Sequence, residues 1–361
     1  MSHSYITSTG SFLPGDPVAN ESIGRYLGRT PGERRVRSKI LRVNGIQTRH
    51  YALDRAQNAT HSVYELASAA IRACVSKQPD PAAIEYLAAG STHTPLLAPG
   101  IGSLVHDQLH KDAVVERPLE ISSSAGICSS GAQALVNADR AVKSGDVAAA
   151  LAVGVEQSSV ALKSKAFRPS YDLAAMLRDV RRSKWFMSVF LRFMLSDGAG
   201  AVLLQQQPHT GGRALRVDWS FSRSFANEAP LCMYLQSDPI RLSQDVTILA
   251  RYMEPLSLRA LEAALQAHNE QLSDYSTILP HLSSYYFEPV VQRVIAKLAP
   301  GRDVPYWTNL QRAGNTGAAS IYIMLDEYLA TQPVKVGDRL LLFVPESGQF
   351  NFVIVALTVV S

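Results

Sequence analysis

Two stretches of this chain follow the same pattern of residues, and this repetition limits the folds that the chain can adopt. The stretch from Cys128 reads CSSGAQALVNADRAVKSGDVAAALAVGVE, and the stretch from Asn315 reads NTGAASIYIMLDEYLATQPVKVGDRLLLFVPES. Each has a polar residue, a helix that starts with small residues, a Lys-x-Gly-Asp turn and an apolar strand. The repetition predicts two similar halves, 1–212 and 213–361, packed around a pseudo-twofold axis. Chance recurrence of strands and helices is the alternative explanation.

Short apolar runs alternate with helix-period segments along the whole chain. The runs predicted as buried strands are 84–91, 148–155, 199–205, 277–283 and 338–345. The segments predicted as helices are 62–76, 128–144, 247–269, 289–298 and 316–331. Strands separated by helices favour an α/β protein whose sheets are covered on both faces.

The overall charge and composition exclude several classes of protein. A formal net charge of +4 is too small to indicate nucleic-acid binding. With 47% hydrophobic and 18% charged residues, the chain reads as a globular protein with a large core. No apolar run approaches the ~20 residues of a membrane span, and the N-terminus lacks a signal-peptide pattern, so we expect a cytoplasmic protein without stable membrane insertion.

The three cysteines are too few and too scattered for a disulfide framework, and their spacing predicts no metal site. Cys128 lies where small residues start a predicted helix, and the helix dipole and free backbone N–H groups there favour a thiolate nucleophile. An inert cysteine in a small-residue helix contact is the alternative. Cys74 reads as packing within a helix, and Cys232 as a loop or pocket-lining residue.

His281 and Asn315 lie in turns equivalent to those of the first half. His281 lies at the end of a predicted strand, and Asn315 precedes a predicted helix. Equivalent turns converge at the interface between two similar halves, where ligand sites of α/β proteins tend to lie, so we expect both residues near Cys128. Alternatively, His281 is a structural histidine and Asn315 a helix N-cap.

These residues belong to an ordered set of motifs that spans nearly the whole chain. The set comprises YITSTGSFLPGDPVAN, NGIQTRH, STHTPLLAP, AGICSSGAQAL, SDGAGAVLL, ILPHLSS, RAGNTGAAS and VGDRLLLF. With Cys, His and Asn in this order, the chain resembles the β-ketoacyl-acyl-carrier-protein synthase III branch of the thiolase-fold condensing enzymes. The resemblance implies a thiolase fold with α-β-α-β-α layers and a homodimer. It also implies acyl thioesters of an acyl carrier protein or coenzyme A as substrates, and no cofactor.

The resemblance also implies a mechanism. Cys128 would hold an acyl group, with the backbone N–H groups of Cys128 and Gly348 as the oxyanion hole. His281 and Asn315 would stabilise the enolate of a second thioester, which attacks the acyl group in a Claisen condensation. A malonyl donor would be decarboxylated in this step. The alternatives are acyl transfer to an alcohol or amine, and a non-catalytic subunit that sets chain length. A papain-like hydrolase is disfavoured by the α/β pattern and the late Asn turn.

Two motifs depart from the family pattern. The family's His-Gln-Ala-Asn is His-Leu-Ser-Ser at 281–284, and its Gly-Gly-Gly-Phe is Ser-Gly-Gln-Phe at 347–350. These changes argue against the ordinary acetyl-primed reaction. Within the branch, the chain looks more like ketosynthases that join two fatty-acid-derived thioesters, such as those forming dialkylresorcinol or cyclohexanedione precursors, where a Michael addition closes the ring.

Segment 163–195 is rewritten relative to compact family members, and it is rich in arginine and aromatic residues. It could line an acyl pocket, form a basic surface for an acidic carrier protein or coenzyme A phosphates, pack on a dimer partner, or be a solvated basic face over core residues. Arg182 in this segment, Arg49 in NGIQTRH and Arg293 are candidates for the carrier or phosphate contact. An ordinary surface ion pair is the alternative for each.

Overall fold

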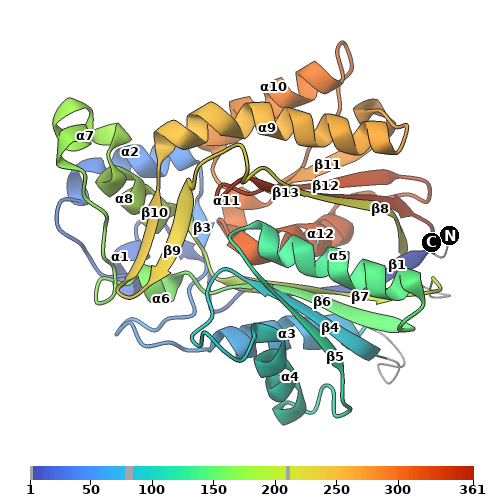
Figure 1. The fold of residues 1–361 in the computed structure, drawn as a ribbon. Helices are drawn as coiled ribbons and strands as arrows, with labels where there is room; N and C mark the ends of the chain where they lie inside the picture. Colours follow the sequence, from blue (N-terminus) through green and yellow to red (C-terminus); the bar gives the residue numbers. More distant parts are fainter. Residues whose placement is uncertain (1–2, 78–83, 209–211) are drawn as a thin grey trace.

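The computed structural model describes residues 3–77, 84–208 and 212–361. One nine-stranded sheet has the order β11-β12-β13-β8-β1-β7-β6-β4-β5. Its centre is narrow, because β1 (Ser4–Phe12) pairs with β8 (Leu215–Ser224) only from Ser4 to Ile6. The sheet therefore divides at this seam into two parts, which Figure 1 shows as separate layers.

The two parts of the sheet repeat one topology. The first part adds β4 (Ile84–Ser91), β5 (Glu120–Ala125), β6 (Ala149–Glu156) and β7 (Gly198–Gln205) to β1. The second part adds β11 (Thr277–Pro280), β12 (Arg339–Pro345) and β13 (Asn351–Val359) to β8. In both, a parallel pair (β4 and β6, or β11 and β12) is followed by an antiparallel strand that leads to the seam. The predicted two similar halves are confirmed, and their boundary at 212 and 213 stays a prediction.

Helices form three layers around the two parts of the sheet (Figure 1). The outer layers are α3 (Val63–Val75) with α4 (Ile101–Lys111), and α9 (Val246–Ala267) with α10 (Glu288–Leu298). Between the sheets lie α5 (Ser129–Ser144) and α12 (Ser320–Thr331). The layers run α-β-α-β-α, as expected for a protein whose sheets are covered on both faces.

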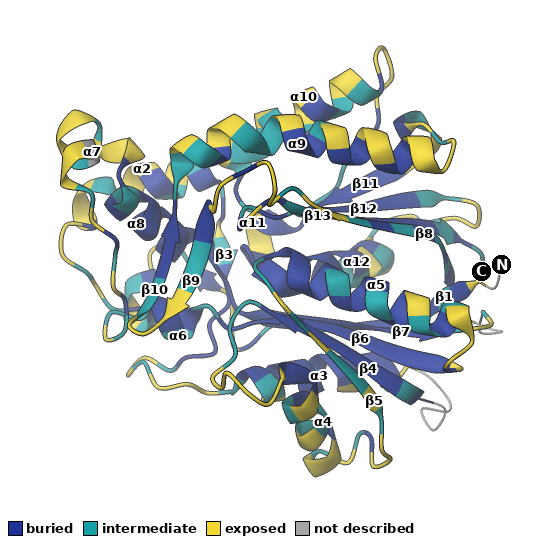
Figure 2. Ribbon diagram, in the orientation of Figure 1, coloured by how far each residue is buried: buried dark blue, intermediate teal, exposed yellow. Residues whose placement is uncertain are grey.

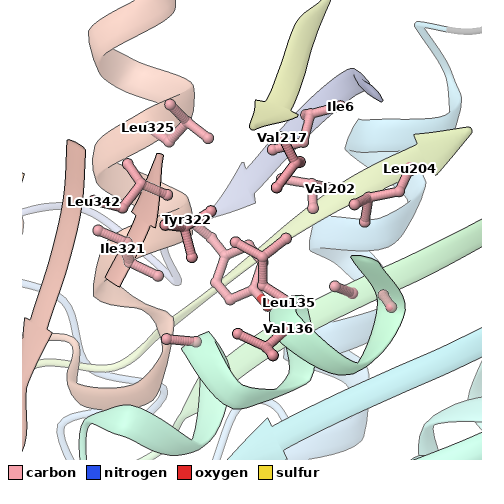
Figure 3. Close-up of a cluster of buried hydrophobic side chains, with 14 of the residues drawn as sticks. Ile6, Leu135, Val136, Val202, Leu204, Val217, Ile321, Tyr322, Leu325 and Leu342 are labelled. Atoms are coloured by element: carbon pink, nitrogen blue, oxygen red, sulfur yellow. The ribbon is translucent and has the colours of Figure 1, made fainter. Parts of the chain in front are cut away.

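The central core joins the two halves. Figure 2 shows that the two middle helices are mostly buried, whereas the outer helices expose one face. In Figure 3, Leu135 and Val136 of α5 lie beside the ring of Tyr322 from α12. The Tyr322 hydroxyl donates a hydrogen bond of 2.7 Å to the carbonyl of Gly131. Apolar burial and this buried hydrogen bond together fix α5 against α12.

Glycines allow the starts of these two helices to come close together. A Cβ atom at Gly131 would lie 2.0 Å from the carbonyl oxygen of Ala318, and one at Gly154 would lie 2.4 Å from the same oxygen. Both distances are far below van der Waals contact, so no larger residue fits without movement. The glycines therefore set the separation between the helix that follows Cys128 and the turn that follows Asn315.

The predicted elements agree with the structure except near the turns that carry polar residues. The strand predicted at 277–283 ends earlier, at Pro280, so His281 lies just beyond β11. The helix predicted at 316–331 begins with a 3-10 turn, η5 (Gly317–Ala319), because Gly317 has a φ of +48° and cannot belong to an α-helix. The first difference places His281 in a turn rather than within a strand, and the second replaces the start of the predicted helix after Asn315 by a 3-10 turn.

The rewritten segment belongs to a lateral group of short elements at the left of Figure 1. This group comprises β2 (Val18–Ala19), α1 (Ile23–Tyr26), α2 (Arg34–Asn44), β3 (Thr48–Arg49), α6 (Ser159–Leu162), α7 (Leu173–Arg178), η2 (Val180–Arg182), α8 (Lys184–Met194), β9 (Met233–Ser237) and β10 (Ile240–Gln244). Shorter elements of the second half are η3 (Leu272–Asp274), η4 (Tyr285–Phe287) and α11 (Leu310–Ala313). Among the helices described, none is both long and apolar enough to cross a bilayer.

Within the rewritten segment, α8 is core and the preceding turn is surface. Arg192 of α8 is fully buried and forms an ion pair of 2.6 Å with Glu33. Its other N–H groups donate to the carbonyls of Leu27, Gly28 and Leu162. Core packing therefore accounts for α8, whereas the residues of η2 are exposed.

Candidate active site

Cys128 directly precedes α5, and its side chain is buried. The sequence predicts a thiolate here, and the structure corrects that prediction. Burial raises the pKa of the Cys128 thiol well above its ordinary value, and the carboxylates of Glu346 and Glu156 raise it further. The Cys128 thiol is therefore protonated at rest, and it would have to lose this proton to act as the predicted nucleophile.

Glu346 occupies the start of α5, where the sequence suggested free N–H groups. Its Oε2 accepts hydrogen bonds from the backbone N–H groups of Ile127 at 3.2 Å and Ser129 at 3.4 Å, and from the Ser129 hydroxyl. The side-chain amide of Asn351 also donates to the Ser129 hydroxyl, at 3.0 Å. The positive end of the helix dipole is thus already matched by a carboxylate.

Glu156 is the counterpart of Glu346 in the first half. Glu156 ends β6, and its carboxylate accepts hydrogen bonds from Thr92 at 2.6 Å, Ser158 at 3.0 Å and the backbone N–H of Ala318 at 3.3 Å. Burial raises the pKa of Glu156 to about 7. Each carboxylate therefore reaches from one half to the helix start of the other half.

His281 is a neutral imidazole with one free nitrogen. Its backbone N–H donates to the carbonyl of Phe343 on β12 at 2.8 Å, which fixes the turn after β11. Nδ1 lies 2.5 Å from the hydroxyl of Ser320, and the buried Nε2 has no hydrogen-bond partner among the described residues. Burial lowers the pKa of His281 to about 4. When Ser320 donates to Nδ1, the ring proton resides on Nε2, ready to be donated to a ligand.

Asn315 is held at its carbonyl oxygen. Oδ1 accepts a hydrogen bond of 2.9 Å from the backbone N–H of Gly317, and the backbone of Asn315 pairs with Met194 and Ser196. Because Oδ1 is engaged in this turn, the amide N–H₂ is the group left for a ligand. The side chain is therefore set up as a neutral hydrogen-bond donor.

Two cavities meet at Cys128. The first, called here the α9 channel, is lined by Cys128, His281 and apolar residues of α9, α10, β11 and β12. The second, called here the Asn315 chamber, is lined by Cys128, Asn315, Glu156 and apolar residues of α8, β9 and β10. Gln244, Ser283 and Ser347 line both cavities. The structure thus brings the three predicted residues to one connected region.

Two family models match the chain. The model described as the thiolase N-terminal domain matches residues 43–180, and the model described as the 3-oxoacyl-[acyl-carrier-protein] synthase III C terminal matches residues 265–349. Together they cover more than half of the chain, in the order that the fold requires. The chain is a synthase III-like member of the thiolase superfamily.

Individual relatives agree with this assignment. The β-ketoacyl-[acyl-carrier-protein] synthase III of Acholeplasma laidlawii is 24% identical over 334 residues, which are 91% of this chain and 90% of that protein. The tetronic acid condensing enzyme AbyA1 has a similar fold, with a TM-score of 0.77, 22% identity, and coverage of 98% of this chain and 99% of that one. A structure of OleA from Xanthomonas campestris has a TM-score of 0.76, 18% identity, and coverage of 99% and 98%. These likenesses agree with the two family models in the fold that they assign to the chain.

Gly348, predicted as an oxyanion-hole donor, lies beside Ile127, the residue that precedes Cys128. A Cβ atom at Gly348 would be 3.0 Å from the side chain of Ile127 and 2.7 Å from Glu346, so the turn packs closely against the start of α5. The carbonyl of Gly348 accepts hydrogen bonds from the backbone N–H groups of Cys232 at 2.9 Å and Met233 at 3.1 Å, and these bonds fix the turn.

The structure contradicts one of the three predicted carrier contacts. Arg49 is fully buried, and its guanidinium donates to the carbonyl of Phe193 and to Asn20, so it cannot reach a carrier protein or a phosphate. Arg293 lies on the exposed face of α10 and forms an ion pair of 2.7 Å with Glu254. Arg182 is exposed on η2, at the edge of a surface hollow.

The other cysteines are buried and line neither of the two cavities that meet at Cys128. Burial raises the pKa of Cys74 and of Cys232 to about 12. Cys74 packs within α3, as predicted, and Cys232 donates to the carbonyl of Asp245 at 3.4 Å. Across the described ranges, no three His, Cys, Asp or Glu side chains are grouped to hold a metal ion.

The sequence analysis missed both buried glutamates. Each lies at the end of the apolar strand of its repeat, since VGVE in the first half corresponds to FVPE in the second. An acidic residue at equivalent strand ends of a duplicated unit is the signal that could have identified them, because strand ends of the two halves converge on one site.

Proposed function

We propose that this synthase III-like chain is a ketosynthase that forms a carbon–carbon bond between an acyl group held on Cys128 and a second thioester. The observation that carries the proposal is the position of Cys128, where the cavity lined by His281 meets the cavity lined by Asn315. A nucleophile between two apolar cavities suits a reaction that joins two acyl groups.

In the first half-reaction, the Cys128 thiol loses its proton and attacks the thioester carbonyl. The acyl–sulfur bond to the incoming carrier breaks, and the carrier thiol leaves with the proton. The backbone N–H groups of Cys128 and Gly348 would stabilise the oxyanion.

In the second half-reaction, His281 and Asn315 would stabilise the enolate. Both are neutral donors. Burial keeps the imidazole of His281 in its neutral form, which still carries one ring N–H, and an amide has no proton to lose at ordinary pH. A neutral donor stabilises the enolate oxygen without returning a proton to the carbon, so the enolate survives to attack the acyl group on Cys128.

The α9 channel supports a long acyl chain as substrate. Its wall on α9 is a single stripe of every fourth residue, Leu249, Met253, Ser257 and Leu261. Twelve residues of helix span about 18 Å, which is a length suited to an extended alkyl chain. With the Asn315 chamber for the second substrate, we propose the subtype that joins two fatty-acid-derived thioesters, with ring closure to a dialkylcyclohexanedione or dialkylresorcinol precursor.

A basic surface hollow supports delivery of the substrate by a carrier protein or coenzyme A. The hollow is lined by Lys39, Arg181 and Arg182 together with aromatic residues, and Phe287 lines both this hollow and the α9 channel. Cations beside a channel suit an acidic carrier surface or phosphate groups. We propose this role for Arg182. The substrate thioesters supply the chemistry, and we propose no additional cofactor.

We further propose that the enzyme acts as a cytoplasmic homodimer. In the described sheet, β5 is an edge strand, and the loop before α4 exposes Leu96 at 48% and Leu97 at 93%. An antiparallel pair of β5 strands from two copies would cover this edge in a self-complementary interface. Sedimentation analysis tests this proposal, and a monomer at micromolar concentration would refute it.

Product analysis separates condensation from the alternatives. The protein is incubated with an acyl thioester and a malonyl or β-ketoacyl thioester, and protein and products are analysed by mass spectrometry. An adduct on Cys128 and a new carbon–carbon bond are expected. An ester or amide without that bond would indicate acyl transfer, and a folded protein without an adduct would indicate a non-catalytic subunit.

Variants of the three residues test the division of labour. Cys128→Ala should abolish acylation. His281→Ala and Asn315→Ala should retain acylation and lose condensation. Normal condensation by Asn315→Ala would contradict the role assigned to its amide.

A further inference from the structure

The Asn315 chamber contains a carboxylate to which the proposed mechanism gives no role. Glu156 is the one Asp or Glu among the described residues that line this chamber, where it accompanies Cys128 and Asn315. Its side chain is only 3% exposed. A buried carboxylate costs free energy unless it is compensated, so its position in a reaction chamber needs an explanation.

The hydrogen bonds of Glu156 leave one of its oxygens lightly engaged. Oε2 accepts from Thr92 and from the backbone N–H of Ala318, whereas Oε1 accepts only from Ser158. Three fixed donors hold the carboxylate in one orientation. An ionised carboxylate oxygen has two lone-pair sites, so Oε1 retains capacity to accept a proton.

Glu156 is also tied to the turn that carries Asn315. A Cβ atom at Gly317 would lie 2.1 Å from Oε2, so the backbone of this turn lies directly against the carboxylate. Asn315 is fixed to the same glycine through Oδ1. The carboxylate and the amide that would stabilise an enolate are therefore held at a constant separation, as a proton acceptor and its enolate site must be.

The groups to which the proposed mechanism already gives a role are poor proton acceptors. Nδ1 of His281 is occupied by Ser320, and its buried ring has a pKa lowered to about 4. The sulfur of Cys128 carries the acyl group at this stage. Burial raises the pKa of Glu156 to about 7, which is the range in which a general base both exists as a base and accepts protons effectively.

We propose that Glu156 accepts the α-proton of the second thioester, so that this enzyme can condense an ordinary acyl thioester that has no carboxylate to lose. This inference rests on the proposed function and specifies its donor. The carbon–hydrogen bond breaks, its electron pair forms the enolate, and the proton goes to Oε1. The enolate carbon then bonds to the acyl carbon on Cys128, the bond from that carbon to sulfur breaks, and the thiolate recovers the proton from Glu156.

The test compares donors in Glu156→Gln. Gln retains the shape and can still accept from Thr92 and Ala318 through its carbonyl oxygen, but it cannot take a proton. With a malonyl-type donor, breaking the bond to the carboxylate supplies the electron pair, so no base is needed. We measure acylation of Cys128, product from a malonyl thioester, product from a saturated acyl thioester, and loss of deuterium from an α-deuterated acyl thioester.

The wild type should condense both donors. Glu156→Gln should still form the Cys128 adduct, and its condensation rate should fall at least about 100-fold more with the acyl donor than with the malonyl donor, a typical general-base contribution. The release of deuterium from the α-deuterated acyl thioester to water should fall together with the acyl-donor activity. Glu156→Asp, which keeps a carboxylate, should restore part of the activity.

Three results would overturn the inference while leaving condensation on Cys128 intact. The first is a wild type that condenses the malonyl donor and not the acyl donor. The second is an equal loss with both donors in Glu156→Gln, which would indicate that Glu156 only supports the Asn315 turn. The third is normal acyl-donor activity in Glu156→Gln with loss in His93→Gln, because His93 also lines the chamber. A wild type without any Cys128 adduct or carbon–carbon product would instead refute the proposed function itself.

Discussion

Narrowing the α9 channel at its middle should shorten the acyl chains that the enzyme accepts. Ser257 is 3% exposed and is the small residue in the stripe of larger side chains that lines the channel. Ser257→Phe would place a ring between Met253 and Leu261. The part of an acyl chain beyond this point could then no longer be buried in the channel. Each excluded methylene costs about 0.8 kcal/mol of burial. A chain that loses four methylenes should therefore lose about 3 kcal/mol, or about 200-fold in kcat/KM.

The assay is the rate of Cys128 acylation for a series of acyl thioesters of increasing length. Chains too short to reach Ser257 should react as in the wild type, and the rate should fall steeply beyond one length. Ser257→Ala is the matched control, because it removes only the hydroxyl, which donates to the sulfur of Met253 at 3.7 Å. A folded Ser257→Phe protein with the wild-type dependence on chain length would refute the assignment of this channel to the acyl chain.

Three further predictions follow from the packing and charge of the site. Gly131→Ala should lower the free energy of unfolding by about 1–3 kcal/mol and slow condensation by about 100-fold, because the added Cβ would lie 2.0 Å from the Ala318 carbonyl oxygen. The melting temperature and the condensation rate are the measurements. Gly24→Ala is the control, because a Cβ there lies 3.8 Å from its nearest neighbour. The pKa of Glu156 in the folded protein, about 7, lies above the ordinary value of 4.5, so the wild type should lose up to about 3 kcal/mol of unfolding free energy as pH rises from 4.5 through 7. Urea unfolding should show this loss, and a Glu156→Gln protein with the same slope would contradict it. Glu346→Gln should lower the pKa of the Cys128 thiol and speed its alkylation by iodoacetamide at neutral pH, because one of the two carboxylates that raise that pKa is removed; an unchanged alkylation profile would contradict this effect.

The sequence predicted the layered fold and the convergence of three residues because both depend on local pattern and on duplication. Apolar strands and small-residue helix starts are visible in the sequence, and the equivalence of the two repeats places Cys128, His281 and Asn315 in turns on one side of the fold. The polar strand β5 was not predicted, because the sequence EISSSA has no apolar alternation.

Long-range contacts account for what the sequence did not reveal. Arg49 was expected at the surface because arginine is usually exposed. It is instead buried, and its guanidinium donates to the carbonyl of Phe193, a residue 144 positions away. Likewise, the helix start at Cys128 was expected to stabilise a thiolate, and only the fold shows that Glu346, 217 positions beyond Ser129, already occupies it. Charge compensation between distant residues has no periodic signature in a sequence.

The exchange of glutamates between the halves has a consequence for how such a centre could be assembled. Glu156 supports the turn that leads to α12 in the second half, and Glu346 supports the start of α5 in the first. A chain of half this length would leave its own helix start uncompensated, and a second copy would have to lend the missing acid. One polypeptide here thus contains the reciprocal geometry of a twofold pair, and its two acids, no longer constrained to be identical, are free to take different tasks.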